Sequence, residues 1–246
     1  WGTAERVDAE IRRVRGILPD DDALVGMAWG LRGLDDTSAE VLGAELAFAE
    51  ELGVRTSLHI ASDGSRPIAA LAEHGLLRPT TTYVHVTGVD DDELRMIADA
   101  GGSVSVSPDV ELKMGFGLPM TGRMAAAGLA PTLSVDDVPA VAGDLFSAMR
   151  TAFAVQRGID GSLNSRELLA AVTIDAARSM GLGGRIGSLT PGKRADLVLL
   201  RTDDIAMAPV TDPAASVVSS AHPGVVDTVL VDGVVVKREG ALVDGD

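Results

Sequence analysis

Three residues that can bind a metal or move a proton stand at corresponding places in successive repeats of the chain. His59 and His85 each close a short strand-like run, and Asp136 directly follows the run at 132–135. If these runs are parallel strands, their carboxyl ends meet at one edge, which is where barrel enzymes place their active sites. Two imidazoles and a carboxylate match the nitrogen and oxygen ligands of a catalytic zinc or iron site. One histidine alone would be interpreted as a core residue, but three such positions favour a site.

The elements that would position these residues alternate between helix and strand from residue 5 to about 182, which is typical of βα units around a parallel sheet. Strands are predicted at 23–29, 54–60, 82–86, 103–108 and 131–135. Helices are predicted at 6–17, 39–52, 67–74, 90–100, 122–127, 143–157 and 166–180, with a loop rich in Gly and Met after residue 108. Five such repeats fit either an open doubly wound sheet or part of an eight-stranded barrel.

After residue 184 the pattern changes to glycine-rich turns and strands rich in β-branched residues. Strands are predicted at 195–200, 225–231 and 234–237. Asp232-Gly233 between the last two is a strong hairpin signal. A small β unit is therefore expected to follow the α/β region.

Composition excludes several classes of function. The 246 residues carry a formal net charge of −15 and no basic cluster, so a nucleic-acid partner is not expected. The sequence contains no apolar run long enough to cross a bilayer and no signal peptide, which predicts a cytoplasmic protein without a membrane partner. Cysteine is absent, which removes disulfides and thiol ligands. The expected partner is a small-molecule substrate, and homo-oligomerisation stays open.

The segment from Gly184 to Leu200, GRIGSLTPGKRADLVLL, resembles the closing signature of the amidohydrolase superfamily, and Val225 to Gly233 resembles its final hairpin. The resemblance implies a TIM-type (β/α)8 barrel, of which strands 4 to 8 are present in residues 1–183. It also implies a small C-terminal β-sandwich portion, whose return strands occupy residues 184–246. The chain begins without Met, so we expect an N-terminal truncation that leaves the earlier strands before Trp1.

In the cytosine deaminase and chlorohydrolase-like branch, the resemblance implies one divalent metal, with zinc expected and iron as the alternative. His59 and Asp136 would be metal ligands, together with a His-x-His pair that this chain lacks. His85 and Asp136 would be catalytic: His85 would polarise the substrate, and Asp136 would move the proton of the attacking water. A role for His85 as a ligand of a second metal remains an alternative.

Two departures from the family pattern restrict the predicted reaction. Ser62 stands where deaminases of this branch usually have a Glu, and a hydroxyl is not a general acid near neutral pH. The predicted strand at 23–29 contains no Lys that could bridge two metals, which favours one metal. We therefore predict hydrolysis of carbon-nitrogen bonds, other than peptide bonds, in a small cyclic or amide-type molecule by metal-activated water.

The sequence leaves two alternatives to a metal-dependent hydrolase. The first is a catalytically inactive relative, or a fragment that lacks the His-x-His ligands. The second is a nucleotide-binding α/β protein, which is weaker because no glycine-rich loop joins a strand to a helix. The rim residues Arg32, Asp109, Glu111 and Met114 are expected either to contact the substrate or to lie in solvated loops.

Overall fold

The computed structural model describes residues 4–19, 22–61 and 63–243, and these form one parallel and one antiparallel sheet. In the parallel sheet every strand pairs with the next one along the chain. Its strands are β1 (Ala28–Leu31), β2 (Arg55–Ala61), β3 (Thr81–Thr87), β4 (Ser103–Val106) and β5 (Pro131–Leu133). The prediction of an α/β fold with five parallel strands is confirmed. A doubly wound sheet reverses its strand order at a switch point, and these five strands show no reversal.

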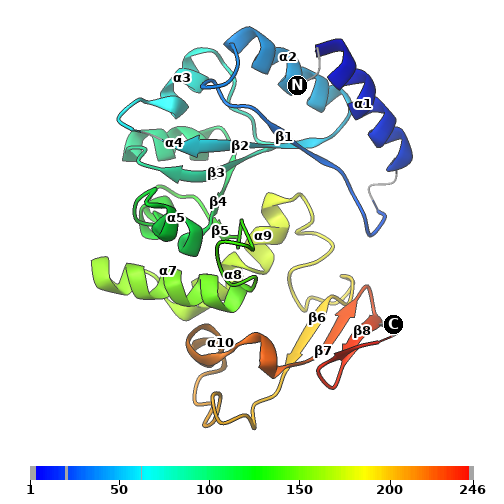
Figure 1. Cartoon of the computed structure of the whole chain (residues 1–246), viewed down its shortest axis with the longest axis vertical. Helices are drawn as coiled ribbons and strands as arrows, with labels where there is room; N and C mark the ends of the chain where they lie inside the picture. Colours follow the sequence, from blue (N-terminus) through cyan, green and yellow to red (C-terminus); the bar gives the residue numbers. More distant parts are fainter. Residues whose placement is uncertain (1–3, 20–21, 62, 244–246) are drawn as a thin grey trace.

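Helices cover the parallel sheet along its outer side, where Figure 1 shows them following the strands in an arc. They are α1 (Ala4–Ile17), α2 (Ala39–Glu51), α3 (Pro67–Glu73), α4 (Asp91–Asp99), α5 (Pro108–Met114), α6 (Thr121–Ala126), α7 (Leu145–Ile159), α8 (Ser165–Ala171) and α9 (Ile174–Ser179). Leu42 and Leu46 of α2 and Leu58 of β2 are among the fully buried side chains. Burial of this apolar layer between helices and sheet is the main driving force for the fold.

The helices α2 and α4 each begin directly after a residue whose side chain caps the helix. Ser38 caps α2 by accepting a hydrogen bond from the Val41 N–H at 3.2 Å. Asp90 and Glu93 form a reciprocal capping box at the start of α4. The predicted starts of both helices are therefore confirmed.

Two predicted boundaries were wrong in the parallel half. The strand predicted at 23–29 begins only at Ala28, because residues 22–25 form turns that leave Leu24 and Val25 mostly exposed. Pro108 does not end a strand but begins α5, where its missing N–H costs no helical hydrogen bond. The segment predicted as a loop after residue 108 is therefore helical as far as Met114.

The long helix predicted at 166–180 is interrupted. It forms α8 and α9 with a break at Val172 and Thr173, where the Thr173 hydroxyl donates to the carbonyl of Leu169 at 2.7 Å. Such side-chain bonds to the preceding turn compete with regular helix formation.

The antiparallel sheet has the order β6–β7–β8–β9 and lies at the opposite end of the molecule from α2 (Figure 1). Its elements are β6 (Leu197–Leu200), β7 (Val226–Val231), β8 (Val234–Arg238) and β9 (Ala241–Leu242). The predicted hairpin turn is confirmed, since Asp232 and Gly233 have φ values of 48° and 81° between paired strands.

The chain between β6 and β7 contains one helix that the sequence pattern did not predict. This is α10 (Pro213–Ser220), which begins with an Asp212 cap. A short 3-10 turn (Pro223–Val225) leads from it into β7. Among the described residues, no helix combines the length and apolar character needed to cross a membrane.

Candidate active site

His59, His85 and Asp136 line one pocket of about 580 Å³ at the carboxyl ends of the parallel strands, which we call the rim pocket. The rings of His59 and His85 are stacked, with centroids 5.4 Å apart and planes inclined by 16°. Nε2 of His85 lies 3.5 Å from Oδ2 of Asp136. The structure thus brings together all three residues selected from the sequence. Their chemical roles remain predictions.

The backbone is strained at two of these three residues. His85 and Asp136 have φ values of 65° and 58°, in the left-handed region that non-glycine residues seldom adopt. Between β2 and β3, Ile60 pairs with His85 but Ala61 pairs with Thr87, so Val86 bulges out of the register. Bulges redirect side chains, and such strain tends to gather at functional sites.

Glu111 is a member of this site that sequence reasoning treated only as a rim residue. Its side chain is fully buried on α5. Its Oε1 atom accepts the Ser107 N–H at 2.8 Å and lies 3.2 Å from Nδ1 of His85. Its other oxygen, Oε2, has no hydrogen-bond partner among the described residues. One sequence signal was available: Ser107 and Glu111 are four residues apart, so in a helix their positions lie on the same face.

A second set of hydrogen bonds restrains the backbone at Asp136. The Ser134 hydroxyl accepts the Asp136 N–H at 3.0 Å. The Ser107 hydroxyl in turn donates to the Ser134 hydroxyl at 3.3 Å. The segments that follow β4 and β5 are therefore connected by hydrogen bonds.

The walls of the rim pocket combine acidic and apolar groups. Asp35, Asp36 and Asp137 lie on its polar side. Phe116 packs edge-on against the ring of His85, with centroids 5.7 Å apart, and Met114 lies beside it. The pocket is therefore suited to a small molecule that has an apolar face and polar or cationic groups.

Two other rim candidates have different surroundings. Arg32 also lines the pocket, and it pairs with Glu45 at 3.2 Å. Asp109 lies away from the pocket and accepts a 2.5 Å hydrogen bond from Thr151 of α7. The interpretation of Asp109 as a substrate contact is therefore not supported.

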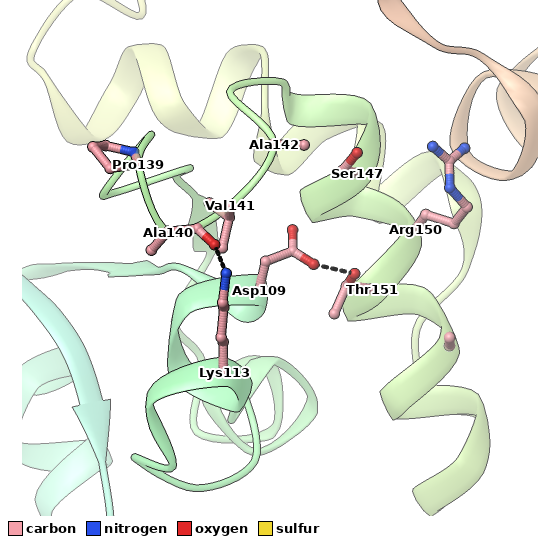
Figure 2. Close-up of a pocket in the computed structure, with 10 residues that line it drawn as sticks. Asp109, Lys113, Pro139, Ala140, Val141, Ala142, Ser147, Arg150 and Thr151 are labelled. Atoms are coloured by element: carbon pink, nitrogen blue, oxygen red, sulfur yellow. Dashed lines mark hydrogen bonds between the residues drawn. The ribbon is translucent and has the colours of Figure 1, made fainter.

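A larger groove, of about 780 Å³, lies between α5 and α7 (Figure 2). Its cationic groups already have hydrogen-bond partners: Lys113 donates to the carbonyl of Ala140, and Arg150 donates to the carbonyls of Ser219 and Ala221, outside the groove. We assign the chemistry to the smaller rim pocket because it contains both imidazoles and Asp136.

His59 and Asp136 fit part of a metal site. They offer an imidazole nitrogen and carboxylate oxygens, the donor types used by catalytic zinc. His59 is exposed in the rim pocket, and within the described ranges its ring nitrogens have no hydrogen-bond partner. The described residues hold no cluster of three or more His, Cys, Asp or Glu arranged for a metal. Further ligands would have to come from elsewhere, as the resemblance implies. Ser62, at the position of the usual Glu, lies outside the described residues.

The family model named Amidohydrolase family matches residues 36–236. The chain belongs to the amidohydrolase family. The matched segment includes four of the five parallel strands, β2 to β5, most of the residues that line the rim pocket, and β6, β7 and the start of β8. The resemblance stated from the closing signature is thereby confirmed.

Similar members of this family include named deaminases. The chain is 28% identical to the 5'-deoxyadenosine deaminase of Methanothermobacter thermautotrophicus, over 98% of the chain and 60% of that protein. It is 34% identical to the 5-methylthioadenosine/S-adenosylhomocysteine deaminase of Desulforudis audaxviator, over 78% of the chain and 48% of that protein. The chain thus spans about half of each relative's length, so the activity of the whole protein is a matter for proposal.

Solved structures of amidohydrolases share the fold. An adenosine deaminase from Xanthomonas campestris with bound zinc superposes with a TM-score of 0.90 at 25% identity, covering 98% of this chain and 57% of that one. An atrazine chlorohydrolase from Arthrobacter aurescens TC1, complexed with zinc, gives a TM-score of 0.91 at 23% identity, covering 99% of this chain and 58% of that one. The second likeness concerns the fold alone.

Proposed function

We propose that the intact protein is a metal-dependent hydrolase that cleaves carbon-nitrogen bonds, other than peptide bonds, in a small cyclic or amide-type molecule. The observation that carries the proposal is the convergence of His59, His85 and Asp136 on one pocket in a member of the amidohydrolase family. Residues 1–183 would then be the later part of a (β/α)8 barrel. Residues 184–246 would supply the return strands of a small β-sandwich.

One divalent ion would be held by His59 and Asp136, with its remaining ligands supplied from outside the chain described here. Zinc is favoured because the similar adenosine deaminase was crystallised with it. When bound, such an ion supplies a Lewis acid that makes water nucleophilic near neutral pH.

Asp136 is placed to move the protons. Hydrolysis requires water to lose a proton as it attacks carbon, and the departing nitrogen to gain one as the carbon-nitrogen bond breaks. The carboxylate of Asp136 can accept the first proton and deliver it to the nitrogen, which leaves as ammonia or an amine. The Ser134 hydroxyl accepts the backbone N–H of Asp136 and so restrains the left-handed backbone from which the carboxylate reaches the pocket.

His85 is placed to stabilise the charge that develops on the substrate. Nε2 faces the pocket near Asp136, while Nδ1 is engaged by Glu111. With Nδ1–H donated to Glu111, Nε2 can also donate only when the ring carries both protons; that Nε2–H group would bond to the oxygen or ring nitrogen that becomes negative in the tetrahedral intermediate. Phe116 and Met114 would cover the substrate's apolar face and reduce the access of bulk water.

The activity of the intact, zinc-supplied protein tests the proposal. The first substrates are 5'-deoxyadenosine, 5'-methylthioadenosine and S-adenosylhomocysteine, chosen from the names of the similar deaminases, followed by cyclic amides and ureas. We expect hydrolysis of at least one compound, with loss of activity on chelation and recovery on zinc addition. No hydrolysis across the panel, with zinc present, would favour the inactive relative instead.

A further inference from the structure

Two glutamates of the described chain are almost fully buried, and they differ in how their charge is compensated. Glu93 accepts hydrogen bonds from three backbone N–H groups, those of Ile68, Ala69 and Asp90, and so joins α3 to α4. Glu111 accepts one backbone N–H and contacts His85, and its Oε2 has no partner in the described part of the chain. Burial of an incompletely bonded carboxylate is costly. The buried position of Glu111 is therefore better explained by what it does to His85 than by folding.

The atoms involved indicate which group donates. Oε1 of Glu111 already accepts the Ser107 N–H, and the same oxygen lies 3.2 Å from Nδ1 of His85. An oxygen acting as an acceptor toward one N–H is suited to accept a second. Nδ1 of His85 is then the donor, and Nε2 is the nitrogen left to face the pocket.

The ring of His85 is restrained by its other neighbours as well. His59 stacks on one face, and the ring of Phe116 meets it edge-on. These contacts restrict the plane of the ring, but they do not distinguish its two edges, because a ring turned over by 180° would occupy the same plane. Within the described residues, only Glu111 makes a hydrogen bond that can select which edge faces Asp136.

We propose that Glu111 is a positioning residue for His85. Its carboxylate accepts the Nδ1–H of His85, fixes the ring's tautomer and orientation, and so presents Nε2 to the substrate. Hydrogen bonds from the far nitrogen of a functional histidine commonly set its tautomer in this way. The Ser107 and Ser134 hydroxyls connect this arrangement to Asp136, because Ser107, whose N–H bonds to Glu111, donates to Ser134, which accepts the backbone N–H of Asp136. The catalytic consequence rests on the proposed function, whereas the hydrogen bond itself does not.

The test combines nuclear magnetic resonance with kinetics on the intact protein and three variants. Glu111→Leu removes the acceptor, and Glu111→Gln retains an amide oxygen that can accept Nδ1–H. Glu93→Gln is the matched control, because it alters an equally buried carboxylate that is not bonded to His85. Long-range proton–nitrogen correlation identifies which ring nitrogen of His85 carries a proton, in metal-free and zinc-supplied protein, with a His85 variant to assign the signal.

We expect a proton on Nδ1 in the wild type, in Glu111→Gln and in Glu93→Gln. In Glu111→Leu we expect a shift toward the Nε2-protonated tautomer and a fall in kcat of about 10- to 100-fold with little change in KM. Glu111→Gln should recover most of the lost kcat. Loss of stability alone would lower the folded fraction in Glu93→Gln too, but would not change the tautomer.

An Nδ1 without a proton in the wild type would overturn the proposal, and this result requires no variant to fold. An unchanged tautomer in Glu111→Leu would also overturn it. If the tautomer depends on Glu111 but no compound is hydrolysed, the proposed function fails and the positioning role stands. If hydrolysis is observed but the tautomer is independent of Glu111, only the positioning role fails.

Discussion

The residues of the rim pocket and the strands of the antiparallel sheet were both predicted from the sequence. The two regions differ in backbone conformation and in whether their buried polar atoms have hydrogen-bond partners. At the rim pocket, His85 and Asp136 adopt left-handed backbone conformations, and a buried oxygen of Glu111 has no partner among the described atoms. In the antiparallel sheet, the left-handed residues lie in the hairpin turns Asp232-Gly233 and Glu239-Gly240, where tight two-residue turns require that conformation.

This difference separates residues that identify the family from residues that could carry its chemistry. The closing signature and the final hairpin are rich in turns whose backbone conformation suits glycine or Asp-Gly. Their residues are therefore explained by folding. The rim residues violate local preferences and must be held by their surroundings, which is the usual condition of a functional site. Substitutions in the two regions should therefore affect different measurements.

The largest expected effect comes from Asp136→Asn. Asparagine tolerates the left-handed backbone as aspartate does, so the fold should be retained. Loss of the proton-accepting carboxylate should lower kcat by about 100- to 10,000-fold. Steady-state kinetics with the best substrate, together with a thermal unfolding curve, checks both parts. Near-wild-type turnover would remove Asp136 from the mechanism.

His85→Asn distinguishes a substrate-facing role from a metal-binding one. If His85 only faces the substrate, kcat should fall by about 100-fold or more while the metal content stays at the wild-type level. Elemental analysis of the purified variant measures the metal directly. A parallel loss of metal would instead make His85 a ligand and revive the two-metal alternative.

Gly187→Ala probes the closing signature, Gly184 to Leu200, where the chain packs against α9 before entering the antiparallel sheet. A Cβ at this position would lie 2.6 Å from Cβ of Ala177 and 2.9 Å from the carbonyl oxygen of Thr173, at a φ of 84°. We expect a loss of about 1–3 kcal/mol in the free energy of unfolding, measured with denaturant, and an unchanged kcat below the unfolding transition. A fall in kcat without a loss of stability would show that this region contributes to the reaction.

Tyr83 is fully buried in the core, on β3, two residues before His85. Its hydroxyl accepts the Arg78 N–H at 3.1 Å, and burial raises its pKa above the ordinary value of 10.0. The neutral hydroxyl therefore contributes stability that is fully present below about pH 10 and is lost as the pH rises through the folded-state pKa.

Tyr83→Phe should cost about 0.5–1.5 kcal/mol near neutral pH, through loss of the hydrogen bond to Arg78. The variant should also lose less stability than the wild type when the pH is raised above 10. Denaturant titrations at neutral and alkaline pH measure both effects. An identical alkaline decline in the two proteins would mean that other groups cause it.

The elements with strong local signals were predicted well, and those decided by tertiary contacts were not. The helix starts at Ser38 and Asp90 were predicted, and at each of them a side chain satisfies a specific backbone N–H. The run at 23–29 failed because apolar composition does not reveal whether a segment is covered, and here Leu24 and Val25 are exposed.

The same distinction applies to the site. The strand-end positions of His59, His85 and Asp136 could be recognised from spacing, since parallel strands direct their carboxyl ends to one edge. The contact between Glu111 and His85 could not, because it joins a helix and a strand that are 26 residues apart. The bulge at Val86, next to His85, likewise depends on the register of β2 against β3.

The metal content of the intact protein, compared with that of His59→Ala, tests the central claim most directly. Because His59 is exposed and has no hydrogen-bond partner among the described residues, its removal should leave the fold unchanged. We predict roughly one equivalent of zinc or iron per wild-type chain and a strongly reduced content in the variant. A wild type with less than about a tenth of an equivalent after zinc addition, or a variant with unchanged content, would contradict a metal site at the rim pocket.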